Sequence, residues 1–164
     1  MVIENKNKSV RISQVRYLFA IIFFPLIVIL STTDLIRESF IGLTKYHWAI
    51  VLAVAYLLQN IYEYLRDFNY IYFSDEDEKG KLLLRYVSLR PFNNKKQSIE
   101  IKNDDLHSYK INRKGLNLKQ ELVLYVYTPQ GIAKYPPISI SALSEEEFNK
   151  MKKILNQTLK ITEN

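Results

Sequence analysis

The chain has 164 residues, 23 Lys and Arg against 17 Asp and Glu, a formal net charge of +6 and no cysteine. The lack of cysteine excludes disulfides, thiolate metal sites and cysteine nucleophiles. The sequence contains no zinc-ligand pattern, arginine-rich tract or RNA-binding aromatic motif, so we expect no nucleic-acid partner.

The first long element is an apolar stretch, residues 17–33, which carries no charged side chain. About 17 residues is the shortest helix that crosses the hydrocarbon core of a bilayer. A soluble helix would need a polar face, and none exists between Leu18 and Leu30. Pro25 would destabilise a soluble helix, but a membrane bundle tolerates it. These features favour a membrane span.

A second apolar stretch, residues 46–62, follows after a short connection and has Trp48 near its start. Two stretches of matched length predict a transmembrane hairpin with spans at about 17–33 and 46–65. The alternative is a cleaved signal peptide followed by one anchor, since small residues at 31–33 could form a cleavage site. The basic flank that both interpretations share consists of Lys6, Lys8, Arg11 and Arg16.

The charges on either side of the first span predict the orientation. The N-terminal flank is basic, with only Glu4 opposing it, whereas the connecting loop is balanced. The positive-inside rule therefore places both termini in the cytoplasm and the loop outside. The balanced loop charges are Arg37 and Lys45 against Asp34 and Glu38.

The remainder of the chain, 67–164, is expected to form one small domain, preceded by a cytoplasmic basic segment at 1–16 and the hairpin at 17–66. Apolar alternation and turn residues predict a series of short strands. The expected strands are 68–74, 81–89, 97–102, 106–112, 121–128, 132–135 and 138–140.

A helix is expected to follow the strands. Ser144 and Glu147 have the spacing of a capping box, in which each side chain bonds the other residue's backbone N–H. Phe148, Met151 and Leu155 fall on one face, which should plug the sheet. Phe148→Ala is then expected to destabilise the fold by about 3–5 kcal/mol.

Two spans, a run of short antiparallel strands and one capped C-terminal helix resemble the bacterial pleckstrin-homology (PH)-like membrane proteins. The segment PPISISALSEEEFNKMKKIL, residues 136–155, is similar to the end of such domains. The resemblance implies a membrane α-helical hairpin plus an α+β soluble domain, in which the helix caps a bent antiparallel sheet or barrel. It also implies the bacterial inner membrane.

Few residues suggest chemistry. His47 and His107 are isolated, and the sequence has no nucleophile elbow or glycine-rich phosphate loop. The acidic run 75–78 lacks the spaced oxygens and glycine of a calcium loop, and a solvated turn is the simpler interpretation. The same acids oppose phosphoinositide binding by the basic residues nearby. We therefore expect no catalytic, cofactor or metal site, and no small-molecule substrate.

The remaining candidates are contact residues. Polar and small residues on the second span could bind another transmembrane helix, although solvation at the interface is the simpler interpretation of the polar ones. Basic residues next to the spans could contact anionic lipids. The candidate partner contacts are Ala49, Ala53, Gln59 and Asn60, and the candidate lipid contacts are Arg11, Arg16 and Arg66.

These features together predict a non-enzymatic inner-membrane adapter or regulatory subunit, which presents its domain to a larger complex. Its partners would be membrane lipids and either a membrane protein or further copies of itself. One alternative is a protein that senses lipid or membrane stress through its domain. Another is a small oligomeric transporter component, which the lack of charges in the middle of either span disfavours.

Overall fold

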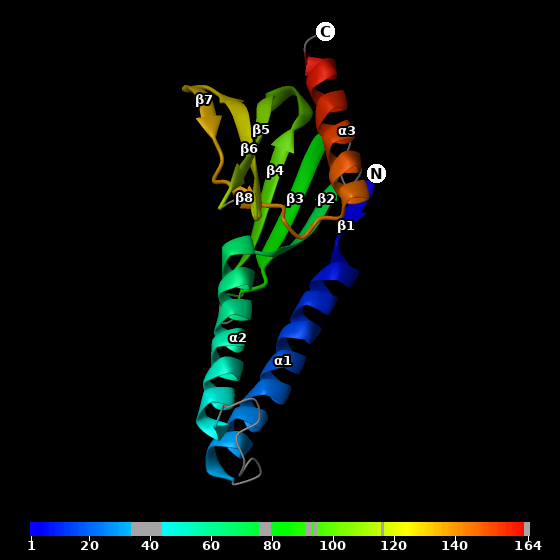
Figure 1. The fold of residues 1–164 in the computed structure, drawn as a ribbon. Coiled ribbons are helices and arrows are strands. Elements are labelled where there is room, and N and C mark those ends of the chain that lie inside the picture. The colour runs from blue at the N-terminus through cyan, green and yellow to red at the C-terminus, as the bar shows by residue number, and fades with distance from the viewer. Residues whose placement is uncertain (34–43, 76–79, 91–92, 94, 116, 163–164) are drawn as a thin grey trace. The chain divides into compact units, whose positions relative to one another are not determined.

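The computed structural model describes residues 1–33, 44–75, 80–90, 93, 95–115 and 117–162. The chain forms two compact units (Figure 1). Unit 1 combines Met1–Val10 with Leu65–Asn164, and unit 2 is Arg11–Tyr64. The loop charges Asp34, Arg37 and Glu38, used above to predict orientation, lie outside the described residues.

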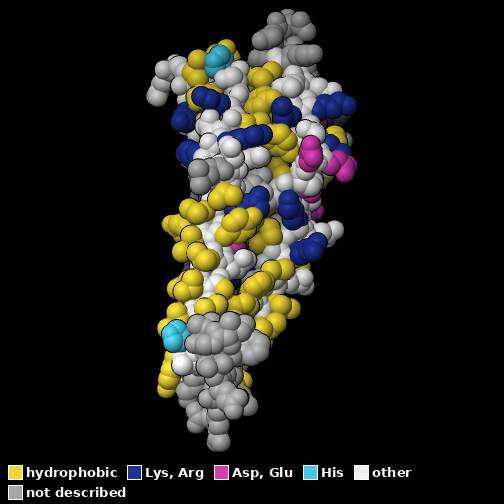
Figure 2. All heavy atoms as spheres, in the orientation of Figure 1, with side chains coloured by type: hydrophobic (Ala, Val, Ile, Leu, Met, Phe, Trp, Pro, Cys, Tyr) yellow, Lys and Arg dark blue, Asp and Glu magenta, His cyan; other side chains and the backbone are white. Residues whose placement is uncertain are grey.

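Unit 2 is built from two helices, α1 (Lys6–Thr32) and α2 (Lys45–Arg66), whose ends extend into unit 1. Both are long and apolar enough to cross a membrane, and their most apolar windows have no buried residue. On the face shown in Figure 2, hydrophobic side chains make up most of the visible surface of these helices. An apolar surface of this extent needs lipid or another protein to cover it.

One stripe on each helix is less exposed than the rest, and its residues recur at intervals of three or four. This spacing is that of two helices packed along a seam. Phe23 on α1 stacks on Tyr56 of α2 with ring centroids 6.2 Å apart, so the two stripes face each other. The seam residues are Ile12, Ser13, Arg16, Phe19, Ala20, Phe23, Ile27 and Leu30 on α1, and Ala49, Leu52, Ala53, Tyr56, Gln59, Asn60 and Glu63 on α2.

Unit 1 contains two antiparallel sheets. The first has the strand order β1-β2-β3-β4, and in the second β6 pairs with β5, β7 and β8. The strands are β1 (Val2–Glu4), β2 (Asn69–Ser74), β3 (Lys81–Ser88), β4 (Lys96–Lys102), β5 (Leu106–Lys114), β6 (Lys119–Thr128), β7 (Gly131–Lys134) and β8 (Ile138–Ser139). A 3-10 turn at Asn103–Asp105 connects the two sheets.

The seven strands expected from the sequence are therefore present, with ends that differ by one or two residues. Strand β1 is an addition. Ile3 pairs with Phe73 on β2 and is 3% exposed, so the segment before α1 contributes to the core of unit 1. The described ladders form two separate sheets and do not close into a barrel.

Helix α3 (Glu145–Thr162) runs beside the sheets of unit 1, near β1 (Figure 1). Its apolar face enters the hydrophobic core shared by both sheets, because Met151 and Leu155 are fully buried there. Phe73 and Leu124 belong to the same core, one from each sheet. One helix therefore covers apolar residues that two small sheets could not bury alone.

Candidate interaction surfaces and polar clusters

The polar residues of unit 2 lie on the seam between α1 and α2. Arg16 Nε is 2.5 Å from Glu63 Oε2, and Gln59 donates to Glu63 Oε1 at 3.2 Å. Asn60 donates to the backbone oxygen of Tyr56. Gln59 and Asn60, predicted from the sequence as contacts for a partner helix, thus have hydrogen-bond acceptors within their own helix.

The small residues predicted as partner contacts occupy the same seam. Ala49 is only 8% exposed and Ala53 is half-buried. Their neighbours Ile50 and Val54 are well exposed and apolar, as expected of side chains that face lipid. Little of the Ala49 surface remains for a second protein.

The three predicted lipid contacts have different surroundings. Arg11 is exposed on α1. Arg16 is occupied by the ion pair with Glu63. Arg66 donates to the backbone oxygen of Leu118 at 3.4 Å, and its guanidinium lies 5.2 Å from the ring centroid of Phe68. Among these arginines, Arg11 has the surroundings that best suit a lipid headgroup.

The segment before α1 is bonded into unit 1 by Asn5, which is 1% exposed. Asn5 Oδ1 accepts from the Ile71 backbone N–H at 2.7 Å, and Asn5 Nδ2 donates to the Asn69 oxygen at 3.0 Å. Ser9 donates to Asn5 Oδ1 at 3.1 Å. A side chain that satisfies two backbone groups of β2 fixes the position of β1 and the first turn of α1.

A charged network lies where α2 leads into β2. Asp67, which follows α2, has a positive φ of 48°. Its two carboxylate oxygens lie 2.7 Å from Arg90 Nε and 2.8 Å from Lys119 Nζ. Lys119 also lies 2.8 Å from Glu121 Oε1, and Lys114 Nζ lies 2.8 Å from Glu121 Oε2. The network links the residue after α2 to Arg90, which follows β3, and to β5 and β6.

The network shifts two pKa values away from their ordinary ranges. Burial by itself would raise the pKa of Glu121, but the ammonium groups of Lys114 and Lys119 outweigh it and the pKa is lowered. Burial would lower the pKa of Lys119, but Asp67 and Glu121 outweigh it and the pKa is raised. Both shifts favour the charged forms, so the network is held together as ion pairs.

The capping residues of α3 have the geometry of a capping box. The Ser144 backbone N–H donates to Glu147 Oε2 at 2.6 Å, and the Glu147 N–H donates to Ser144 Oγ at 3.3 Å. Of the three residues predicted to plug the sheet, Met151 and Leu155 are buried. Phe148 is half-buried at the edge of the core, beneath Lys152 Nζ at 5.7 Å from its ring centroid.

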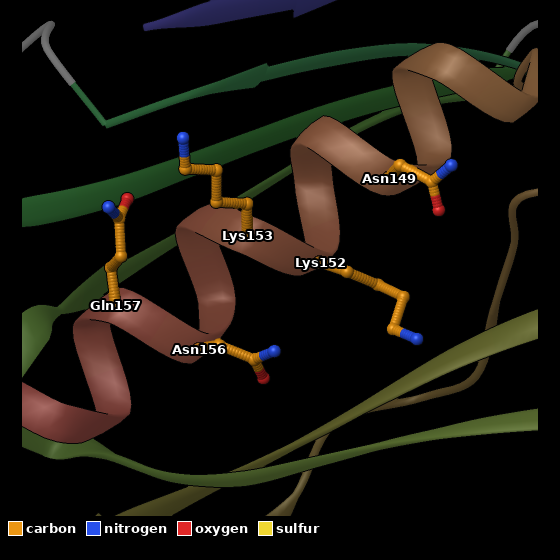
Figure 3. A pocket seen from close by; sticks show the side chains of 5 residues that line it. All are labelled: Asn149, Lys152, Lys153, Asn156 and Gln157. Carbon is orange, nitrogen blue, oxygen red and sulfur yellow. The ribbon is translucent and has the colours of Figure 1, made fainter.

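The outer flank of α3 contains a polar hollow of about 430 Å³. In Figure 3, Lys153 and Gln157 point to one side of the helix, and Lys152 and Asn156 point to the other. Asn149, one turn earlier, completes the lining. We call this set of five residues the α3 flank; none of its side chains is acidic. The sequence singled out the apolar face of this helix and gave no signal for the hollow.

A second groove, of about 330 Å³, lies between the ends of β4 and β6. Glu100 and Lys102 are among its lining residues. Beside it, Tyr127 and Ile132 form a cross-strand pair and are 50% and 56% exposed. His107 Nδ1 lies 2.8 Å from the Tyr127 hydroxyl. The groove therefore combines charges of both signs with an exposed aromatic residue.

The histidines occupy separate local environments. His47 Nδ1 lies 2.7 Å from Thr44 Oγ1 at the start of α2, whereas His107 contacts Tyr127 on β6. Within the described ranges, no three His, Asp or Glu side chains are grouped so that they could hold a metal ion. Of the acidic run 75–78, only Asp75 is among the described residues.

No protein-family model matches the chain, and neither a curated protein nor a solved structure matches it significantly. The class of the protein therefore follows from its own architecture. It combines two helices with membrane-spanning character and a two-sheet domain completed by a C-terminal helix.

Proposed function

We propose that the protein is a non-enzymatic adapter or regulatory subunit of the bacterial inner membrane. The hairpin anchors it, and a PH-like domain on the cytoplasmic side binds a protein partner within a larger complex. The observation that carries the proposal is the pairing of β1 with β2. Because of this pairing, the chain before the first apolar helix and the chain after the second belong to one folded domain.

The segments on either side of the two apolar helices belong to one domain, and this favours two membrane crossings over one. If both helices span the bilayer, the segments that flank them must lie on the same side, as β1 and β2 do. Removal of a signal peptide by cleavage near residues 31–33 would also remove Ile3 and Asn5, which are 3% and 1% exposed in unit 1. The basic N-terminal flank favours the cytoplasm as the common side.

The PH-like assignment rests on the two antiparallel sheets and the helix that completes their core. Protein binding is favoured over lipid sensing because unit 1 presents a polar hollow and a groove, whereas Arg16 and Arg66 are engaged within the chain. The polar groups Arg16, Gln59 and Asn60 on the hairpin seam also have acceptors within the hairpin, which disfavours a transporter role.

The experiment is purification of the tagged full-length protein from bacterial membranes in a mild nonionic detergent. We expect a membrane or cytoplasmic protein to co-purify at a fixed stoichiometry and to survive a second affinity step. A matched control carries Ile3→Asp, which should disrupt β1 and the domain and release the partner while the hairpin stays in the membrane. Recovery of the protein with lipid alone would contradict the adapter function and support the sensor.

A further inference from the structure

The α3 flank has unpaired positive charge. Lys152 and Lys153 are adjacent, and no ion pair in the described part of the chain includes either one. Lys150, on the same helix, differs because it pairs with Glu146 four residues earlier. The lining of the hollow therefore has one lysine on either side of the helix and three carboxamides, and it contains no acidic side chain (Figure 3).

Two contacts position these groups. Asn156 Oδ1 accepts a 2.7 Å hydrogen bond from the hydroxyl of Tyr109 on β5, which leaves the Asn156 amide nitrogen to donate in another direction. Lys152 Nζ lies 5.7 Å from the ring centroid of Phe148, which restricts the lysine side chain. Donors that are already ordered lose less conformational entropy when they bind a ligand.

We propose that the α3 flank binds an acidic peptide segment of a protein partner. The two lysines match carboxylates, and the carboxamides of Asn149, Asn156 and Gln157 can both donate to and accept from a peptide backbone. A phosphate group could accept from the ammonium and carboxamide N–H groups but has few donors for the three carboxamide oxygens, whereas an acidic peptide has carboxylates for the lysines and backbone N–H and C=O groups for the carboxamides. The inference rests on the proposed function, because it identifies the surface and the chemistry by which the partner is bound.

The test uses the full-length protein in nanodiscs of uncharged phosphatidylcholine and a fluorescein-labelled peptide of alternating Glu and Ser. Fluorescence anisotropy should show saturable binding that weakens as salt is added. The double variant Lys152→Gln/Lys153→Gln should reduce the affinity about fivefold, as the loss of two exposed ion pairs of ordinary strength would. Lys150→Gln is the matched control and should leave the affinity unchanged.

Three results would overturn the proposal. The first is failure of the peptide to bind, or equal binding by the wild type and the double variant. The second is stronger binding of a neutral Gln-Ser peptide, which would mean that acidic side chains are not recognised, or displacement of the acidic peptide by dihexanoyl phosphatidylglycerol. If the lipid displaces the peptide at a lower concentration than unlabelled peptide does, the surface would be assigned to lipid phosphate. The third is loss of binding in Tyr127→Ala alone, which would place the peptide in the other groove.

The same variants separate this proposal from the proposed function. A partner that co-purifies equally with the wild type and the double variant would retain the adapter function and reject the α3 flank as its surface. Lysine-dependent peptide binding without any co-purifying partner would retain the surface and reject the adapter.

Discussion

The two units of the chain use the same apolar residue types in opposite ways. In unit 1, Leu124 and Leu155 are 2% and 0% exposed, within a core formed by two sheets and α3. In unit 2, Ile21 and Phe24 are each 71% exposed. Unit 1 therefore has its own solvent-excluded interior, whereas unit 2 depends on an apolar environment outside the chain. A membrane provides that environment.

The buried polar groups of the units also differ. Asn5 in unit 1 bonds backbone groups of a strand, so it supports the sheet. Glu63 in unit 2 bonds side chains on the helix seam, so it supports the pairing of two helices. Mutations that act on one kind of interior should leave the other intact, which gives ways to test the comparison.

The largest expected effect is in the core of unit 1. Leu155→Ala should lower the free energy of unfolding of unit 1 by about 2–5 kcal/mol, because it leaves a cavity among buried side chains. Ile21→Ala, on the exposed face of α1, should change it by less than about 0.5 kcal/mol. Hydrogen exchange of the β6 amides in detergent micelles measures both; equal protection in the two variants would contradict the core assignment.

A smaller loss is expected at the strand before α1. Asn5→Ala leaves a buried N–H of Ile71 and a buried oxygen of Asn69 without their partner, which should cost about 2 kcal/mol. Asn7→Ala, at an exposed position two residues later, is the matched control. Protection of the β2 amides should fall in the first variant only. Unchanged protection would mean that β1 contributes little to unit 1.

The charged network predicts a pH dependence. The lowered pKa of Glu121 means that its contribution to stability is complete above the ordinary value of 4.5 and is lost as the pH falls through the lower folded pKa. The raised pKa of Lys119 means that its contribution is complete below 10.5 and is lost as the pH rises through the higher folded pKa. Stability should therefore be greatest between these limits.

Glu121→Gln tests the expected loss of stability at low pH. It removes the charge that Lys114 and Lys119 bind, so it should cost about 1.5 kcal/mol at neutral pH and flatten the acidic side of the profile. The measurement is the denaturation midpoint of unit 1 at a series of pH values. A variant profile parallel to the wild-type profile would show that other carboxylates control the acid transition.

The smallest expected effect is at the edge of the core. The sequence predicted about 3–5 kcal/mol for Phe148→Ala on the assumption of a fully buried plug. Because Phe148 is half-buried, we now expect about 1 kcal/mol. Urea denaturation of this variant beside Leu155→Ala should show the smaller shift for Phe148→Ala. A shift as large as that of Leu155→Ala would indicate a fully buried ring.

Local patterns in the sequence were sufficient to predict the two apolar helices, seven strands and the capped helix. Each has a signal within a few residues, such as the alternation in β6 or the spacing of Ser144 and Glu147. Strand β1 has no such signal. Its three residues precede the basic N-terminal part of α1, and only pairing with β2, more than sixty residues away, makes them a strand.

The candidate residues also divide into those that a local pattern indicates and those that depend on contacts between distant parts of the chain. The sequence could propose Arg16 as a lipid contact, but the ion pair that it forms with Glu63 joins positions 47 residues apart. The network around Asp67 and Glu121 is likewise formed by tertiary contacts. The hollow on α3 depends on which helix face the sheets cover, and the positions of exposed lysines do not reveal it.

If both helices span the membrane, the segment before α1 and the domain after α2 lie on the same side of it. Because the chain has no cysteine, single substitutions Asn7→Cys, Ser39→Cys and Glu145→Cys give clean accessibility reporters for a membrane-impermeant maleimide. On intact cells, we expect labelling of Ser39→Cys only, and labelling of Asn7→Cys and Glu145→Cys after the membrane is opened. Labelling of Asn7→Cys and Glu145→Cys from opposite sides would contradict it.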